Sequence, residues 1–182
     1  MNPSDCYKTH RYKILAWLAV LALFGIVYTY VLEFEYFSNT FQSDTLIYKS
    51  VLAAVILGSI MAWRFAKGVK DIAGKMQVWT SFLVLPILTA PLAGSLANRL
   101  LSPYPIEIKQ LGFFQEKAFA SSAMGFIEGE KTEPEGYFVF VVYNGKLERL
   151  KSKIPRFIGL EPGGSVSIPI QKGLFGYEVV RW

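Results

Sequence analysis

Three long stretches with almost no charged residue occupy most of the first hundred positions and limit what this chain can fold into. They cover residues 14–32, 46–63 and 78–97, and Lys49 is the only charged residue within them. A helix rising ~1.5 Å per residue needs roughly 20 apolar residues to cross a bilayer core about 30 Å thick. Together with an apolar content of 52%, these lengths predict an α-helical membrane region of three transmembrane helices over residues 1–101.

The first stretch is interpreted as a retained span rather than a cleaved secretory signal. Basic residues precede it, as in a signal peptide, but the apolar part of a signal peptide has only about 7–15 residues. This one is longer, and it runs into the sequence IVYTYVLEFEY, which lacks the small residues of a cleavage site. We therefore expect a multi-pass membrane protein.

Basic residues predict how the three spans are oriented. Lysine and arginine favour the cytoplasmic side of short loops, and tryptophan collects at membrane–water boundaries. Residues 33–45 contain neither Lys nor Arg, whereas basic residues precede the first span and recur in residues 64–75. We expect a cytoplasmic N-terminus and a C-terminal domain on the opposite side. The basic residues and tryptophans on the predicted cytoplasmic side are Lys8, Arg11, Lys13, Trp17, Trp63, Arg64, Lys67, Lys70, Lys75 and Trp79.

Two prolines in the third span, Pro86 and Pro91, predict a kink. Proline is tolerated inside a membrane helix where neighbouring helices and hydroxyl groups bind the carbonyls that it leaves unpaired. The alternative is a broken helix lining a pathway, which would make the chain a small transport or channel component. Such pathways carry charges inside the membrane, and none of the three spans has a charge at its centre. We therefore prefer the kinked span.

Small residues spaced four apart predict the contact between the second and third spans. They let helix backbones approach closely in a membrane. We expect a contact within one chain, with self-association into a homo-oligomer as the alternative. The predicted packing residues are Ala54, Gly58 and Ala62 in the second span and Ala90 and Gly94 in the third.

Residues 102–182 differ in composition and predict a small all-β domain. Residues 137–143, YFVFVVY, are aromatic and β-branched, as strands prefer. Asn144 and Gly145 follow them, and Asn-Gly between two such runs is a strong hairpin signal. Several further short extended segments with glycines between them favour a barrel or sandwich, and an OB-like barrel is one candidate.

A second hairpin is predicted from residues 165–171, SVSIPIQ, through Lys172 and Gly173 into the C-terminal residues. Pro169 has no N–H group and would place the first of these strands at an edge of the sheet. Edge strands bind partner proteins by adding a strand. The candidate interaction residues are Ser165, Val166, Ser167, Ile168 and Ile170.

The residue types of the C-terminal domain restrict its chemistry. Residues 102–182 contain no His, Cys or Asp, which excludes Ser-His-Asp and Cys-His catalytic sites and histidine or thiolate metal sites there. Cys6 and His10 are two ligands at most and do not make a zinc site. Residues 128–136, EGEKTEPEG, are interpreted as a solvated loop, with calcium binding as the alternative. We expect no cofactor and no metal.

Two short motifs resemble those of membrane-anchored signal peptidases. Residues 121–124, SSAM, resemble the serine box, and residues 158–164, IGLEPGG, resemble the downstream glycine-proline-glycine turn. The resemblance implies a nucleophile such as Ser122 activated by a lysine. The turn lacks the family's aspartate, and the nearest lysines, Lys146 and Lys151, do not stand at the base position. A Ser-Lys peptidase is therefore kept as an alternative.

The sequence as a whole favours a non-enzymatic membrane protein that presents a membrane-proximal β-domain for protein–protein recognition. The tether between the last span and the first predicted strand is short, so we expect the partner to be another membrane or envelope protein. Membrane lipids surround the helices, and a nucleic acid partner is not expected, because Lys and Arg nearly balance Glu in residues 102–182. We expect an accessory subunit of an envelope complex or an immunity or exclusion protein. The expected location is the bacterial inner membrane, with the domain periplasmic or extracellular.

Overall fold

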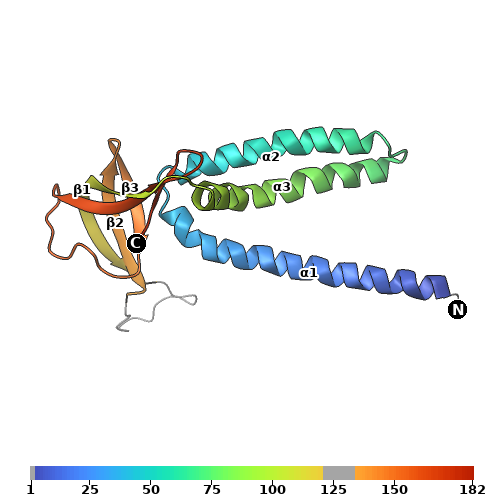
Figure 1. Ribbon diagram of the computed structural model, residues 1–182, viewed down its shortest axis with the longest axis horizontal. Helices are drawn as coiled ribbons and strands as arrows, with labels where there is room; N and C mark the ends of the chain where they lie inside the picture. The colour runs from blue at the N-terminus through green and yellow to red at the C-terminus, as the bar shows by residue number, and fades with distance from the viewer. Residues whose placement is uncertain (1–2, 121–133) are drawn as a thin grey trace, which may run out of the picture.

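The computed structural model describes the backbone of residues 3–120 and 134–182, and the side chains of residues 13–120 and 134–182. Three long helices extend from one side of a β-sheet, and the N-terminus lies at their far end (Figure 1). This layout confirms the prediction of long apolar helices followed by a β-domain. The elements are α1 (Pro3–Ser38), α2 (Ser43–Ala66), α3 (Ile72–Leu100), β1 (Ile106–Phe119), β2 (Gly136–Tyr143), β3 (Lys146–Ser152), β4 (Ser165–Lys172) and β5 (Glu178–Val180).

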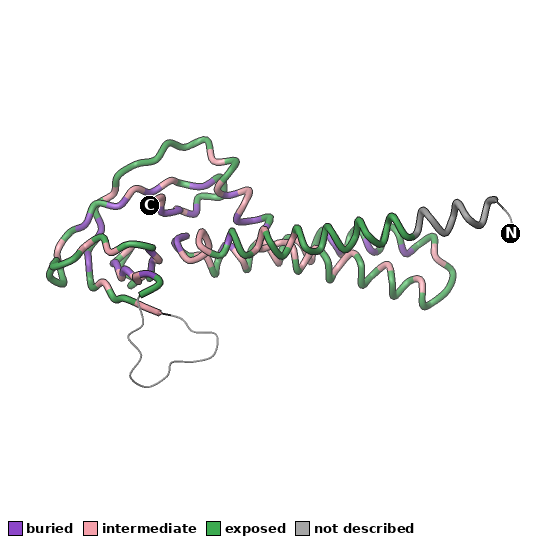
Figure 2. Tube along the Cα trace, turned by 90° about the horizontal axis from the view of Figure 1, so that it is seen from below, coloured by how far each residue is buried: buried purple, intermediate pink, exposed green. Residues whose placement is uncertain are grey.

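The surfaces of the helices are largely apolar and exposed. All three helices are long and apolar enough to cross a membrane. Most of their apolar side chains are exposed, and no residue of the most apolar part of α1 is buried (Figure 2). Apolar surface of this extent is unfavourable in water and favourable in lipid.

α2 and α3 form an antiparallel pair, whereas α1 diverges from them toward its N-terminus (Figure 1). Of the predicted packing residues, Gly58, Ala62 and Gly94 are buried. Ala54 and Ala90 line a groove beside the contact. Gly58 and Gly94 lie where α2 and α3 approach each other, Gly58 against Phe82 and Gly94 against Ser50.

Both prolines lie inside α3, which continues through them to Leu100. The helix changes direction in its C-terminal part (Figure 1). Two hydroxyl groups bind carbonyls in this region: Thr89 donates to the carbonyl oxygen of Leu85 at 3.0 Å, and Tyr30 of α1 donates to that of Leu88. Hydroxyl groups thus accompany the prolines, as is usual in membrane helices.

The five strands form one antiparallel sheet in the order β3-β2-β1-β4-β5, curled into a half-barrel (Figure 1). The predicted hairpin is confirmed in β2 and β3. Its turn residues Asn144 and Gly145 have φ angles of 50° and 75°, as a type I′ turn requires. β1 is a single long strand whose register shifts between Phe113 and Gln115, which marks a β-bulge.

The prediction that β4 is an edge strand is wrong. β4 pairs with β1 along its length and with β5 from Ile170 to Lys172, so the second predicted hairpin forms with a very short partner strand. The carbonyl of Pro169 accepts from the N–H of Arg181 at 2.9 Å, just beyond the end of β5. Its nitrogen faces the same side, beyond the last residue pair of the β4–β5 ladder, Ile170 with Val180, so the missing N–H removes no bond from that ladder. Residues 165–168 keep a strand neighbour on the β1 side alone.

The connection between α1 and α2 fills the gap between the two outer strands. Thr40 forms a bridge with Val179 of β5. Asn39 joins both sides: its carbonyl accepts from the N–H of Val180 at 2.8 Å, and its Oδ1 accepts from the N–H of Lys151 in β3 at 2.7 Å. The half-barrel is therefore completed by residues that the sequence indicated only as a loop between two spans.

The core of the β-domain contains a residue from this connection. Phe41 is 2% exposed, packs in the core and stacks on Tyr143 with ring centroids 4.1 Å apart. Burying a large aromatic side chain contributes about 1.5–3 kcal/mol, so the helical region and the sheet stabilise each other. The other core residues are Leu111, Phe113, Val139, Val141, Leu150, Val166, Ile168, Ile170 and Val180.

Candidate recognition surface

A buried ion pair fixes the ends of α1 and α3 beneath the sheet. Arg99 Nη2 lies 2.7 Å from Glu33 Oε2, and the two side chains are 13% and 2% exposed. Ser95 donates a second hydrogen bond to Glu33 Oε1 at 2.7 Å. The guanidinium of Arg99 also lies 3.8 Å from the ring centroid of Tyr36. Sequence reasoning placed Glu33 in the linker after the first span and missed this pair. The sequence did contain a signal for it, because Glu33 and Arg99 follow the ends of two spans on the same predicted side of the membrane.

Asn98 of α3 holds the loop between β4 and β5 against the helices. Its Nδ2 donates to the carbonyl of Tyr177 at 3.1 Å, and its Oδ1 accepts from the N–H of Phe175 at 3.0 Å. Its own carbonyl accepts from the N–H of Leu174 at 2.8 Å. A Cβ on Gly173 would overlap the Asn98 side chain, so this position requires glycine. Asn39 and Asn98 together fix the orientation of the sheet on the helices, and the ion pair fixes α1 on α3.

A groove of about 390 Å³ lies between the second half of β1 and residues 155–162. Glu116 lines this groove. Its carboxylate accepts from the N–H groups of Arg156 and Phe157, both at 2.9 Å, and so binds the start of the loop to β1. The far end of the same loop is bound to Phe113, whose N–H donates to Gly164 and whose carbonyl accepts from Gly163. Both ends of the loop are thus attached to β1.

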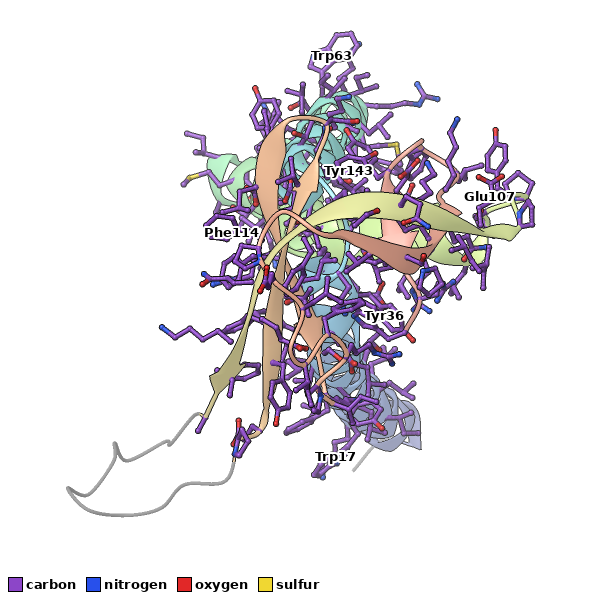
Figure 3. All side chains as sticks on the ribbon, turned by 90° about the vertical axis from the view of Figure 1, so that its left-hand side faces the viewer. Trp17, Tyr36, Trp63, Glu107, Phe114 and Tyr143 are labelled. Atoms are coloured by element: carbon purple, nitrogen blue, oxygen red, sulfur yellow. The ribbon has the colours of Figure 1, made fainter. Side chains whose placement is uncertain are left out.

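Apolar side chains on this groove are exposed. Ile158 is 79% exposed at the outer part of the loop, and Leu160 and Phe114 are also exposed. The β-bulge in β1 turns Phe113 into the core and Phe114 outward, where it lies at the margin of the sheet in Figure 3. Phe157 packs beneath the loop on Phe113 and Trp182. An apolar surface on a loop held this firmly suits recognition of a partner protein.

The structure separates the candidate residues of β4 into two sets. Val166, Ile168 and Ile170 are buried in the core and cannot meet a partner. Ser165 and Ser167 are exposed, and each hydroxyl is hydrogen-bonded to the side chain of Gln110, at 2.7 and 2.9 Å. Because successive side chains of a strand point to opposite faces, only the two serines among the five candidate residues lie at the surface.

The residues of the peptidase alternative are not assembled in the part of the chain that the structure describes. Residues 121–124, including Ser122, and residues 128–133 of the acidic segment lie outside the described residues. The ammonium of Lys151 lies 4.9 Å from the ring centroid of Phe119, and Lys146 is exposed beside the hairpin turn. Among the described residues no group of three or more His, Cys, Asp or Glu could hold a metal ion.

Charged groups near the other end of the sheet have perturbed pKa values. Lys109 Nζ lies 2.5 Å from Glu178 Oε1, and this hydrogen bond raises the pKa of Lys109. Burial, followed by the nearby charge of Glu178, raises the pKa of the Tyr143 hydroxyl. Burial also raises the pKa of the Glu148 carboxyl, and the charge of Asp44 adds to this effect. None of these groups lines the groove.

Comparison with known proteins does not assign a family. No protein-family model, curated protein sequence or solved structure matches this chain. The geometry of the groove and of the joint between sheet and helices therefore carries the functional argument.

Proposed function

We propose that this chain is a non-enzymatic integral membrane protein that presents a rigid, membrane-proximal β-domain to a partner protein. One observation carries the proposal: the sheet is fixed to the helices by polar contacts of the buried residues Asn39 and Asn98, while Glu33 joins α1 to α3 beneath it. A domain joined by a flexible tether would sample many orientations. A domain fixed in this way presents the same face at the same height above the membrane, which lowers the entropic cost of binding a partner located there.

The partner is proposed to bind at the groove beside residues 155–162. Exposed apolar side chains such as Ile158, seated on a loop that is already ordered, resemble the anchors that contribute most of the energy at protein interfaces. Arg156 and Glu161 lie in the same loop and supply polar contacts at the rim. We propose that an apolar side chain of the partner fills the groove while Ile158 packs on the partner.

The proposed location is the bacterial inner membrane, with the N-terminus cytoplasmic and the β-domain periplasmic or extracellular. The distribution of lysine and arginine supports this orientation. The partner is then another envelope protein, and the chain acts as an accessory subunit or as an immunity or exclusion protein. A reporter fused after Trp182 tests the orientation: alkaline phosphatase should be active there, and a cytosolic fluorescent protein should be dark.

Photocrosslinking tests the recognition surface. A photoreactive amino acid at Ile158 should trap one discrete membrane partner in intact cells. The matched control is the same amino acid at Leu147, which is also exposed but lies in β3, away from the groove. Ile158→Asp should abolish partner capture from a second probe at Phe114 without lowering the amount of protein in the membrane. Equal capture from Ile158 and Leu147, or no adduct from either, would contradict the proposal.

A further inference from the structure

Three adjoining cavities run along α2 from the middle of the helix pair to the sheet. The largest, about 590 Å³, lies between α2 and α3 and is lined almost entirely by apolar groups. A second of about 250 Å³ shares Ser50 and Ala53 with it, and a third of about 340 Å³ shares Lys49 and Tyr177 with the second. Phe175, from the loop after β4, lines all three. An apolar groove within the candidate spans therefore leads to a polar cavity beside the sheet.

The polar cavity contains an unpaired cation and several hydrogen-bond donors. Lys49 is exposed, and no carboxylate of residues 13–120 or 134–182 lies within ion-pair distance of its ammonium. Gln42 and Thr45 line the same cavity and can donate from their side chains. Glu178 also lines it; its Oε1 is bound to Lys109, whose positive charge offsets that of the carboxylate, and its buried Oε2 makes no hydrogen bond within the described residues. This set of groups favours an anion at Lys49.

A buried hydroxyl group without a partner lies at the same place. Tyr177 is 9% exposed, and its hydroxyl has no hydrogen-bond partner in the described part of the chain. An unsatisfied buried hydroxyl costs about 1–3 kcal/mol, so a bound group that accepts from it would be stabilising. The ammonium of Lys49 lies 5.5 Å from the ring centroid of Tyr177. Lys49 and Tyr177 therefore lie close together in the lining of one cavity.

The start of α2 adds a partial positive charge to this cavity. Gln42 precedes the helix with a φ angle of 56° and makes no side-chain capping bond, while its carbonyl accepts from the N–H groups of Thr45 and Leu46 at 3.0 and 3.3 Å. The helix end therefore contributes its partial positive charge rather than these two donors. Asp44, the acidic residue of the first turn, does not line the cavity. Lysine, hydroxyl and helix end thus act together at the polar end of an apolar groove.

We propose that these cavities bind one anionic phospholipid, with its phosphate at Lys49 and Tyr177 and one acyl chain in the groove between α2 and α3. The proposal rests on the membrane placement of the helices. Because lipid tails are as apolar as the groove, moving a chain from the bilayer into it changes the free energy little. The phosphate contacts therefore provide the selectivity, and the groove provides the space for the chain.

Titration of lipid onto the full-length, delipidated protein in mild detergent tests the site, with bound lipid counted by native mass spectrometry. The probes are phosphatidylglycerol, a diacylglycerol with the same chains, and inorganic phosphate. Phosphatidylglycerol should add one molecule at the lowest concentration, and diacylglycerol should bind about fivefold more weakly. Fivefold is the ratio that one lysine contributes near anionic lipid, about 1 kcal/mol.

Two variants separate the polar end of the site from the groove. Lys49→Gln should weaken phosphatidylglycerol binding about fivefold and leave diacylglycerol binding unchanged. Ala53→Phe should exclude both lipids, because Ala53 is an exposed residue on the groove wall. The matched controls are Lys75→Gln, at the opposite end of the helix pair, and Ala22→Phe, at an exposed position of α1 that lines none of the three cavities.

The results distinguish this site from ordinary lipid solvation. If Lys49→Gln and Lys75→Gln bind phosphatidylglycerol equally, or if Ala53→Phe and Ala22→Phe do, the lipid site does not exist. If inorganic phosphate alone binds as tightly as phosphatidylglycerol, the ligand is a soluble phosphate and the lipid proposal fails. Partner capture from Ile158 is a separate measurement, so loss of the lipid site leaves the recognition proposal standing.

Discussion

Gly58 of α2 lies directly against the carbonyl oxygen of Phe82 in α3, where a Cβ atom would overlap that oxygen. This carbonyl is also the one that Pro86, four residues later, leaves without its helical donor. The two residues that sequence patterns assign to separate roles, a packing glycine and a kinking proline, therefore meet at one point. The missing side chain allows the α2 backbone to approach a carbonyl that would otherwise face lipid unpaired.

Gly58→Ala should destabilise the α2–α3 pair. The added methyl group must push the helices apart or bend them, and overpacking of this kind costs about 1–3 kcal/mol. The matched control is Gly25→Ala in α1, where a Cβ would meet nothing within 4 Å. That control should be neutral or stabilising by up to about 1 kcal/mol, because alanine is the better helix former. Thermal unfolding of both variants in detergent measures the difference, and equal effects would refute this account of the contact.

Removing one partner of the Glu33–Arg99 pair should be far more damaging. In Glu33→Gln the guanidinium of Arg99 remains buried without its counter-charge, and loss of one member of a buried pair costs about 3–5 kcal/mol. The double variant Glu33→Gln/Arg99→Gln should recover part of that loss. Chemical denaturation in detergent micelles gives the free energy of unfolding for each.

The ion pair of Glu35 with Lys153 provides the control for Glu33→Gln, because its side chains are 42% and 75% exposed. Glu35→Gln should change the stability little, since solvent screens exposed pairs. A Glu33→Gln effect as small as that of Glu35→Gln would show that the buried pair does not join α1 to α3.

The helices and the first hairpin could be predicted from the sequence because their signals are local. Length and apolarity define a possible span, and Asn144-Gly145 defines a type I′ turn without reference to the rest of the chain. The position of β4 could not be predicted in this way. Pro169 lacks an N–H in any context. Whether the missing N–H prevents β4 from pairing on both sides depends on where β5 ends, and contacts with residues far away in the sequence determine that end.

The joint between helices and sheet was missed for a similar reason. Residues 39–41 follow a predicted span and look like a short exterior loop, yet Asn39 and Phe41 complete a barrel whose outer strands, β3 and β5, lie more than a hundred residues later in the sequence. The groove depends on the β-bulge at Phe113 and on Glu116 binding a distant loop. Neither the bulge nor a carboxylate that accepts from backbone N–H groups leaves a pattern that can be recognised in a single sequence.

Asn39→Ala should destabilise the β-domain by about 1–3 kcal/mol, because the N–H of Lys151 would lose its acceptor at the barrel gap. Asn39→Asp keeps an oxygen at the same position and should cost less. Hydrogen exchange provides a local measurement: the Lys151 amide should exchange faster in Asn39→Ala than in Asn39→Asp. If the Lys151 amide is equally protected in both variants, the side chain of Asn39 does not close the barrel.

The β-domain should lose stability in alkali, above about pH 10, and the direction follows from two raised pKa values. Burial raises the pKa of Tyr143, and the hydrogen bond that Lys109 donates to Glu178 raises the pKa of Lys109. In both cases the folded state keeps its proton at a pH where the unfolded state has lost it. The stabilisation is therefore complete below the unfolded pKa values and declines as the pH rises through the folded ones.

Tyr143→Phe separates the contribution of the hydroxyl from that of the ring. Phenylalanine cannot ionise but can keep the stack on Phe41, so the variant should lose less stability than the wild type between neutral pH and pH 11. Lys109→Gln removes the second titrating group and should also flatten the decline, although its starting stability is lower because Glu178 loses its partner. Chemical denaturation at several pH values gives both profiles. If the free energy of unfolding of the wild type increases as the pH rises beyond about 10, the pH dependence has the opposite sign and neither group is its source.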